Sequence, residues 1–191
     1  MSVMKLYLAS KSPRRQELLQ MITTDFTVVD SDFDEKTVPL TEPEQYAISL
    51  ACGKEIHASV TDPDALIIGG ATVVVSPDGR IFGKPADEAE GFSMLKTLSG
   101  QTHSVITGVC LHDKNRTESF AVRSEVTFYP LSDEEIAEYL ACGEYKDKAG
   151  AYGIQGKGGL LCKKIDGDYF NIVGFPAAEI SRRLKARKKS M

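Results

Sequence analysis

Two serines and two arginines early in the chain could bind an anion. The segment KLYLASKSPRRQELL (5–19) begins with an apolar strand pattern, followed by Ser10, Ser12, Arg14 and Arg15 and then by a helix pattern. A helix N-terminus carries partial positive charge and backbone N–H groups, and the guanidinium group matches the geometry of phosphate. The segment therefore predicts phosphate binding, although a surface helix with two solvated arginines has the same pattern.

Glycines and lysines in the middle of the chain offer a second set of candidates. In the run ALIIGGATVVV (65–75), Gly69 and Gly70 would let a ligand approach the backbone closely, or would mark a bulge in a strand. Lys84 precedes a proline, which favours an extended and stiff backbone. Lys54 falls on an expected helix over 42–58. For both lysines the alternative is a solvated side chain.

Carboxylates cluster in the segment DSDFDE (30–35). If this segment is extended, Asp30, Asp32 and Asp34 share one face. Mg²⁺ and Mn²⁺ prefer carboxylate oxygens, so the cluster could hold such a cation. An acidic loop without a metal is the alternative.

The segment DKAGAYGIQG (147–156) has too many glycines for an ordinary helix. Gln155 carries both a donor and an acceptor, which is what reading the edge of a base requires. The pair Gly156-Lys157 does not belong to a Walker loop, because residue 158 is Gly rather than Ser or Thr.

Strands and helices interleave along the chain. Strand patterns cover 3–9, 26–30, 65–69, 72–76, 104–112, 119–128, 159–165 and 168–173, with a hairpin turn at Asp78-Gly79. Helix starts are indicated by Ser12 with Pro13, Thr41 with Glu44, Asp87 with Glu90, Ser132 with Glu135, and Pro176. This order predicts an α/β fold with a mixed sheet flanked by helices.

Composition narrows the class of protein. A chain of 191 residues predicts one domain over 1–191, with two closely joined lobes as a variant. The net charge of -4 argues against a nucleic-acid binder, and the basic segment 182–189 fits a solvated helix end. Four cysteines without a CxxC pair, and no run of about 20 apolar residues, favour a cytoplasmic protein without a membrane span.

Together these segments resemble the Maf family of nucleoside triphosphate pyrophosphatases, and GAYGIQG resembles its branch that acts on dTTP and UTP. The matches follow the family's order over nearly the whole chain. They are SPRR (12–15), Lys54, Gly69 with Thr72, Gly83-Lys84-Pro85, Leu98-Ser99-Gly100, 147–156 and Gly174-Phe175-Pro176. The resemblance implies a fold similar to the inosine-triphosphate pyrophosphatases (the Maf/Ham1 fold), with a ligand cleft across the mixed sheet.

The resemblance also implies roles for individual residues. Lys54 and Lys84 would be catalytic, and Glu35 would bind a divalent cation, Mg²⁺ or Mn²⁺. Six residues would bind the nucleotide or set base preference: Ser10, Ser12, Arg14, Arg15, Thr72 and Gln155. A homodimer is implied as well, and the family's link to septum inhibition gives an alternative role as a non-catalytic, nucleotide-binding regulator of cell division.

One position departs from the family pattern. Where the pattern reads Gly, a small residue, Asp and Thr, this chain has Gly69, Gly70, Ala71 and Thr72. The family's proton acceptor is therefore replaced by Ala71, in an engineered inactive variant or in a natural pseudoenzyme. We expect the chain to bind dTTP or UTP, and to hydrolyse them to the monophosphate and pyrophosphate only slowly, since losing a general base costs about 10² to 10⁴ in rate.

Overall fold

Three long strands form the frame of the protein: β3 (Ala65–Val75), β5 (Thr102–Asp113) and β6 (Arg116–Phe128). The computed structural model describes residues 5–189, so residues 3 and 4 of the expected first strand lie outside the described part. The sheet has the order β2 (Thr27–Val28), β1 (Lys5–Leu8), β3, β5, β6 and β7 (Cys162–Asp166), with β4 (Ile81–Phe82) paired to β3. Parallel pairing of β1 with β2 and β3, and antiparallel pairing of β4 and β7, confirm the mixed sheet.

The chain divides into two units, and the three long strands contribute to both. Unit 1 takes residues up to 71, 107–122 and those from 174 onward, and unit 2 takes 72–106 and 123–173. The expectation of one domain over 1–191 stays a prediction.

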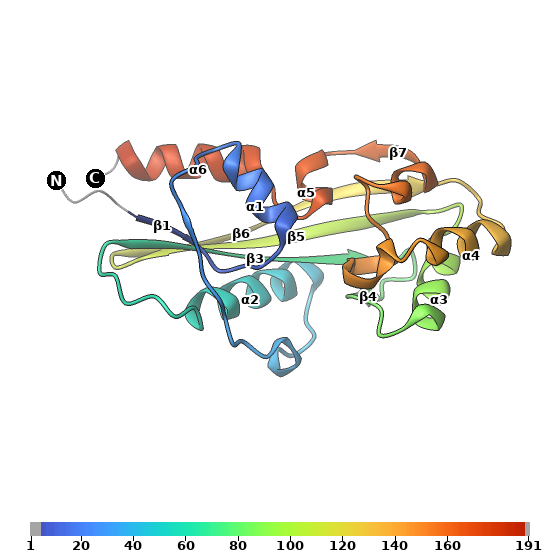
Figure 1. The fold of residues 1–191 in the computed structure, drawn as a ribbon, viewed down its shortest axis with the longest axis horizontal. Coiled ribbons are helices and arrows are strands. Elements are labelled where there is room, and N and C mark those ends of the chain that lie inside the picture. Colours follow the sequence, from blue (N-terminus) through green and yellow to red (C-terminus); the bar gives the residue numbers. More distant parts are fainter. Residues whose placement is uncertain (1–4, 190–191) are drawn as a thin grey trace. The chain divides into compact units, whose positions relative to one another are not determined.

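Unit 1 places helices on both faces of its part of the sheet. It contains β1 (Lys5–Leu8), α1 (Pro13–Gln20), β2 (Thr27–Val28), η1 (Glu35–Thr37), α2 (Pro43–Ile56) and α6 (Ala177–Lys189). Helices α1 and α6 lie on one side of the strands and α2 lies on the other (Figure 1). A Cβ at Gly69 would lie 2.2 Å from the Ala51 carbonyl oxygen, and one at Gly108 would lie 2.3 Å from Ala47. These two glycines therefore let α2 lie directly on β3 and β5.

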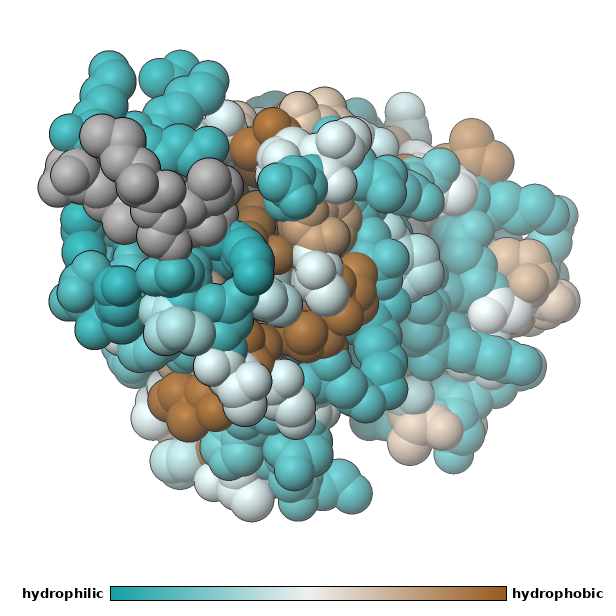
Figure 2. Space-filling view, turned by 60° about the vertical axis from the view of Figure 1, so that its left-hand side comes forward, coloured by the Kyte–Doolittle hydropathy of each residue, from teal (hydrophilic) through white to brown (hydrophobic). Residues whose placement is uncertain are grey.

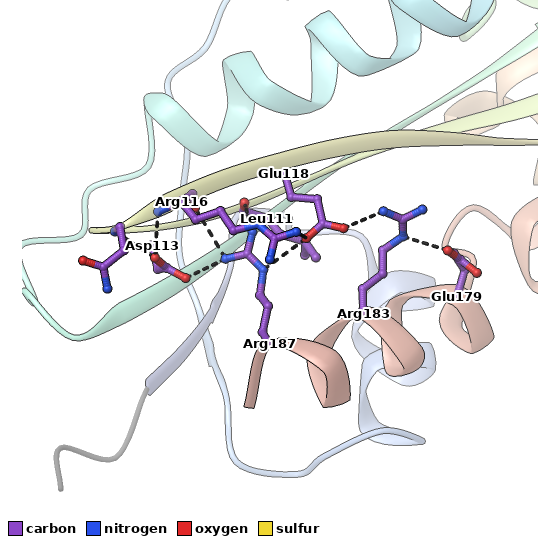
Figure 3. Close-up of polar contacts among 8 residues, drawn as sticks. Leu111, Asp113, Arg116, Glu118, Glu179, Arg183 and Arg187 are labelled. Carbon is purple, nitrogen blue, oxygen red and sulfur yellow. Dashed lines mark hydrogen bonds and ion pairs between the residues drawn. The ribbon is translucent and has the colours of Figure 1, made fainter. Parts of the chain in front are cut away.

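A buried ionic network attaches α6 to the β5–β6 hairpin (Figure 3). Arg187 is 3% exposed, and its Nη1 pairs with Asp113 Oδ2 at 2.6 Å while its Nη2 donates to the Leu111 carbonyl at 3.0 Å. One turn earlier, Arg183 pairs with Glu118 at 2.5 Å. Because both arginines of one helix face meet acidic partners, the helix has a single docking position on these strands.

Unit 2 holds the larger hydrophobic core. It contains β4 (Ile81–Phe82), α3 (Glu88–Leu98), α4 (Asp133–Ala141), η2 (Glu144–Asp147), η3 (Ala149–Ala151), η4 (Lys157–Leu161), β7 (Cys162–Asp166) and α5 (Tyr169–Val173). Side chains from α3 and α4 pack with strand residues such as Val105, Val126 and Phe128. The apolar faces of these helices thus cover the sheet, as the helical spacing of Leu95, Leu98 and their neighbours predicts.

Most expected elements are present. Some of the expected helix caps form hydrogen bonds and others do not. The hairpin at Asp78-Gly79 is confirmed, with Gly79 at φ 84°. Ser132 forms a complete capping box with Glu135, and Asp87 caps α3. Ser12 occupies the cap position of α1, but its side chain makes no capping hydrogen bond.

Three expectations were wrong, and a fourth was wrong in part, because the pattern at 159–165 forms a strand only from Cys162 onward. Helix α2 begins at Pro43 with Glu42 at the cap, so Thr41 and Glu44 form no capping box. The patterns at 65–69 and 72–76 belong to one continuous strand, β3.

The third error concerns 168–173, which contains a helix rather than a strand. Asp168 Oδ1 accepts from the Asn171 backbone N–H, and the buried Asn171 amide donates to the Val105 carbonyl and to Ser124 Oγ. These tertiary contacts override the local β pattern.

One face of the molecule is largely polar (Figure 2). Figure 2 shows one face on which hydrophilic residues predominate, with smaller apolar areas among them. Among residues 5–189, no helix is both long enough and apolar enough to cross a membrane.

Candidate functional site

Arg15 lies over Gly70, the second glycine of the pair in β3. A Cβ at Gly70 would lie 3.3 Å from Arg15 Nε, so the absence of a side chain there makes room for the guanidinium group. Arg15 Nε donates to the Gly174 carbonyl at 2.9 Å, and its Nη1 donates to Ser10 Oγ at 3.3 Å. Ser10 Oγ also accepts from the Ser12 N–H at 3.3 Å. The expected anion-binding residues Ser10, Ser12 and Arg15 therefore do come together at the start of α1.

The charge state of Arg15 reflects its surroundings. Partial burial and then the neighbouring charge of Arg14 lower the pKa of Arg15 to about 10, while the negative charge of Glu35 opposes this shift. Two guanidinium groups thus share a region where their positive charges repel each other. An anion bound here would relieve that repulsion.

Lys54 and Glu35 form the second group in unit 1. Lys54 Nζ lies 2.6 Å from Glu35 Oε1, with Lys54 20% exposed and Glu35 51% exposed. The Phe33 ring lies over Gly53 of α2, where a Cβ would be 2.2 Å from the ring. This contact explains why the segment before η1 lies against α2 and brings Glu35 to Lys54.

Ala71 is the last residue of unit 1 on β3. It is 2% exposed, and alternation along the strand places it on the same face as Gly69, the face covered by α2. The methyl group offers no proton acceptor. A carboxylate at this position would lie on the face of β3 that α2, the helix of Lys54, covers.

The acidic segment 30–35 does not present one carboxylate face. Asp30 pairs with Lys11 at 2.6 Å, and Asp34 Oδ1 accepts from the Lys36 N–H at the start of η1. Within residues 5–189, no group of three His, Cys, Asp or Glu side chains is arranged to hold a metal. Glu35 alone, paired with Lys54, does not amount to a resident metal site.

Unit 2 carries the remaining candidates. Thr72 follows Ala71 on β3 and is half-buried, whereas Lys84 and Gln155 are exposed. The Gly83 carbonyl accepts from the Gly150 N–H at 3.1 Å, which ties the Gly83-Lys84-Pro85 turn to the start of the glycine-rich segment.

Two contributors to these arrangements were not predicted from the sequence. The Gly174 carbonyl supports Arg15 from a point 159 residues away. Glu144 binds backbone N–H groups of the segment that carries Gln155. For Gly174, the sequence did contain a signal, the motif Gly174-Phe175-Pro176. The backbone at Gly174 has a φ of 126°, a conformation that favours glycine. For Glu144 no local pattern pointed to the contact.

The fold and these residues define a known class of protein. A family model described as "Maf-like protein" matches residues 5–187, so the chain belongs to the Maf family. It is 47% identical over 184 residues to a dTTP/UTP pyrophosphatase of Carboxydothermus hydrogenoformans, covering 95% of this chain and 98% of that protein.

Two other relatives carry the same name. The chain is 46% identical over 181 residues to the dTTP/UTP pyrophosphatase of Bacillus velezensis, covering 95% of each chain. It is 45% identical over 178 residues to that of Latilactobacillus sakei, covering 93% of this chain and 98% of the relative.

Among solved structures, the fold is similar to the Ham1 protein of Staphylococcus aureus. The TM-score is 0.54 at 13% sequence identity, covering 95% of this chain and 98% of that one. The prediction of an α/β Maf/Ham1 fold is therefore confirmed. The ligand cleft expected across the sheet stays a prediction.

Proposed function

We propose that this protein binds pyrimidine nucleoside triphosphates, dTTP and UTP, and belongs to the hydrolases that convert them to the monophosphate and pyrophosphate. The observation that carries this proposal is the placement of Arg15 over Gly70, beside Arg14 at the start of α1. A triphosphate is an anion of the charge and geometry that such a pair binds well. The names of relatives that cover nearly the whole chain support the same substrate class.

Unit 1 and unit 2 each carry candidate residues for this chemistry. In unit 1, Arg14, Arg15 and Lys54 would neutralise charge on the phosphates while water attacks the α-phosphorus and pyrophosphate leaves. In unit 2, Lys84 would add a positive charge, and Thr72 and Gln155 would contact the nucleotide and set base preference.

The divalent cation, Mg²⁺ or Mn²⁺, is best treated as part of the substrate. The described residues provide the Glu35 carboxylate, already paired with Lys54, and no set of three ligands. A cation that arrives on the triphosphate needs few protein ligands, because phosphate oxygens and water complete its shell.

Ala71 makes this chain a weak enzyme in our proposal. Without a carboxylate at position 71, no group there can take the proton of the attacking water. Binding of the triphosphate is preserved, since alanine also removes a negative charge that would repel the phosphates.

The decisive experiment compares the unchanged chain with Ala71→Asp and with Ala71→Asn as the matched control. Pyrophosphate release from dTTP, UTP, CTP and GTP is measured for each protein. We expect Ala71→Asp to raise turnover of dTTP and UTP at least about a hundredfold. Asparagine has the shape of aspartate but cannot accept the proton, so Ala71→Asn should have the same turnover as the unchanged chain.

A second function is favoured by the same residue. A regulator that binds nucleotide without hydrolysis, such as one acting in septum formation, would have no need of a carboxylate at position 71. It predicts tight UTP binding by calorimetry and no gain in turnover from Ala71→Asp. That pair of results would replace the enzymatic proposal. Assembly as a homodimer and a cytoplasmic location remain part of the proposal.

A further inference from the structure

Glu144 organises the glycine-rich segment of unit 2. Its Oε2 accepts from the Lys157 N–H at 3.0 Å, and its Oε1 accepts from the Gly158 N–H at 3.1 Å. Tyr139 donates its hydroxyl to Glu144 Oε1 at 3.0 Å and accepts from the Gly153 N–H at 3.1 Å. Glu144 and Tyr139 therefore bind the backbone on both sides of residues 154–156.

The glycines of this segment make room for the carboxylate. A Cβ at Gly156 would lie 2.2 Å from Glu144 Oε2, and a Cβ at Gly153 would lie 3.2 Å from Oε1. At Gly158 a Cβ would lie 2.4 Å from the Gly153 carbonyl oxygen. The segment thus resembles an anion-binding glycine loop in its geometry, but the anion that it surrounds is a side chain of the protein itself.

The same contacts leave Gln155 at the surface. Gly153 and Gly158 are buried, Ile154 packs against the core, and Gln155 is exposed between them. A short loop bound at both ends has few conformations, so its exposed side chain is presented from a fixed backbone. An amide distinguishes two bases only when its donor and acceptor groups stay in place. An amide that rotates freely can hydrogen-bond to either base.

We propose that Glu144, supported by Tyr139, is a positioning residue that sets base specificity by holding the Gln155 loop (residues 153–158). This inference rests on the proposed function, in which Gln155 contacts the base. Glu144 itself touches the loop backbone and not the nucleotide.

The test compares Glu144→Gln with the unchanged chain. The amide of glutamine keeps one acceptor oxygen but loses the second and the charge. Glu138→Gln is the matched control, since it makes the same chemical change at an exposed position of α4. Tyr139→Phe, which removes the hydroxyl and keeps the ring in the core, is a second variant should Glu144→Gln fold poorly.

Calorimetry measures the affinity of each protein for UTP, CTP and inorganic tripolyphosphate. We expect Glu144→Gln to reduce the preference for UTP over CTP about tenfold, with a smaller reduction in Tyr139→Phe. Affinity for tripolyphosphate should not change in either variant, and Glu138→Gln should behave as the unchanged chain. Amide exchange at Lys157 and Gly158 should become faster in Glu144→Gln.

Contrary outcomes separate the inference from the function on which it rests. If the unchanged chain prefers UTP and both variants keep that preference, Glu144 has no role in specificity while the proposed function stands. If affinity for all three ligands falls equally, the residue supports only the fold. If the unchanged chain binds none of the three, the proposed function fails and the specificity role fails with it.

Discussion

The two units bury different kinds of polar side chain. Among the described residues, the buried charged ones, Glu55 and Arg187, both belong to unit 1. The buried polar residues of unit 2 include His103, Ser124 and Asn171, which are hydrogen-bonded and carry no formal charge at neutral pH. In unit 1, Arg187 is compensated by the carboxylates of Asp113 and Glu118, whereas Ser124 and Asn171 of unit 2 form neutral hydrogen bonds.

The difference extends to the candidate site. Unit 1 contributes guanidinium and ammonium groups, which suit the phosphates of a nucleotide. Apart from Lys84, the candidates of unit 2 are neutral, and the amide of Gln155, on a loop held by hydrogen bonds, suits a neutral base.

The largest expected effect is a loss of stability when the ionic network of unit 1 is broken. Arg187→Ala would leave the partly buried carboxylates of Asp113 and Glu118 beside α6 with fewer compensating charges. Removing one partner of a buried ion pair costs about 3–5 kcal/mol, and we expect a loss of that size in the free energy of unfolding. Urea denaturation followed by circular dichroism measures it. Arg182→Ala, on the exposed side of the same helix, should change stability by less than about 0.5 kcal/mol.

A second effect concerns the neutral interior of unit 2. Burial lowers the pKa of His103 to about 4, and its Nε2 lies 2.8 Å from the Tyr152 hydroxyl. The unfolded chain, with the ordinary pKa of about 6.5, takes up a proton first as the pH falls. Stability that is present above pH 6.5 is therefore lost on acidification, by about 2–3 kcal/mol between pH 7 and pH 4.5.

The control for this pH dependence is His103→Gln. Glutamine cannot titrate, so the variant should lose about 2–3 kcal/mol less than the unchanged chain over the same interval. Urea unfolding at both pH values gives the comparison. Equal losses in the two proteins would show that His103 is not the group responsible.

A third prediction tests whether the charge of Arg15 contributes to nucleotide binding or to stability. Arg15→Gln keeps a donor near Gly174 but removes the positive charge beside Arg14. We expect the affinity for UTP to fall by about 1.5–3 kcal/mol, the usual worth of a charged hydrogen bond, as measured by calorimetry. Stability should change by less than about 1 kcal/mol, since repulsion from Arg14 disappears together with the contacts. A large loss of stability with unchanged UTP affinity would place Arg15 with Arg187 as a structural residue.

The smallest effect compares the two serines at helix starts. Ser132 in unit 2 accepts from the Glu135 N–H, so Ser132→Ala should cost about 1 kcal/mol. Ser12 in unit 1 makes no capping hydrogen bond, so Ser12→Ala should cost much less. Thermal unfolding of both variants measures the difference. Equal costs would mean that the two caps work alike.

Local patterns predicted the parts of the fold that local interactions determine. The capping box at Ser132, the cap at Asp87 and the hairpin at Asp78-Gly79 involve residues within eight positions of each other, and all three are present. The segment 168–173 has a β pattern, but the contacts of Asn171 with Val105 and Ser124 span more than 40 residues and make it a helix. No local pattern carries that information.

The same limit applies to the candidate site. Arg14, Arg15, Lys54 and Glu35 could be selected by residue type and family order, and the structure groups them within unit 1. The support from the Gly174 carbonyl, and the carboxylate of Glu144 inside the glycine loop, depend on chain segments that meet only after folding.

The docking of α6 has a consequence for synthesis on the ribosome. Arg187 completes unit 1 by binding residues 111–118, but it is synthesised after the whole of unit 2. Every segment of unit 2 has been made by residue 173. The nascent chain can therefore fold unit 2 before α6 is available to complete unit 1. This reverses the usual order, in which N-terminal parts fold first.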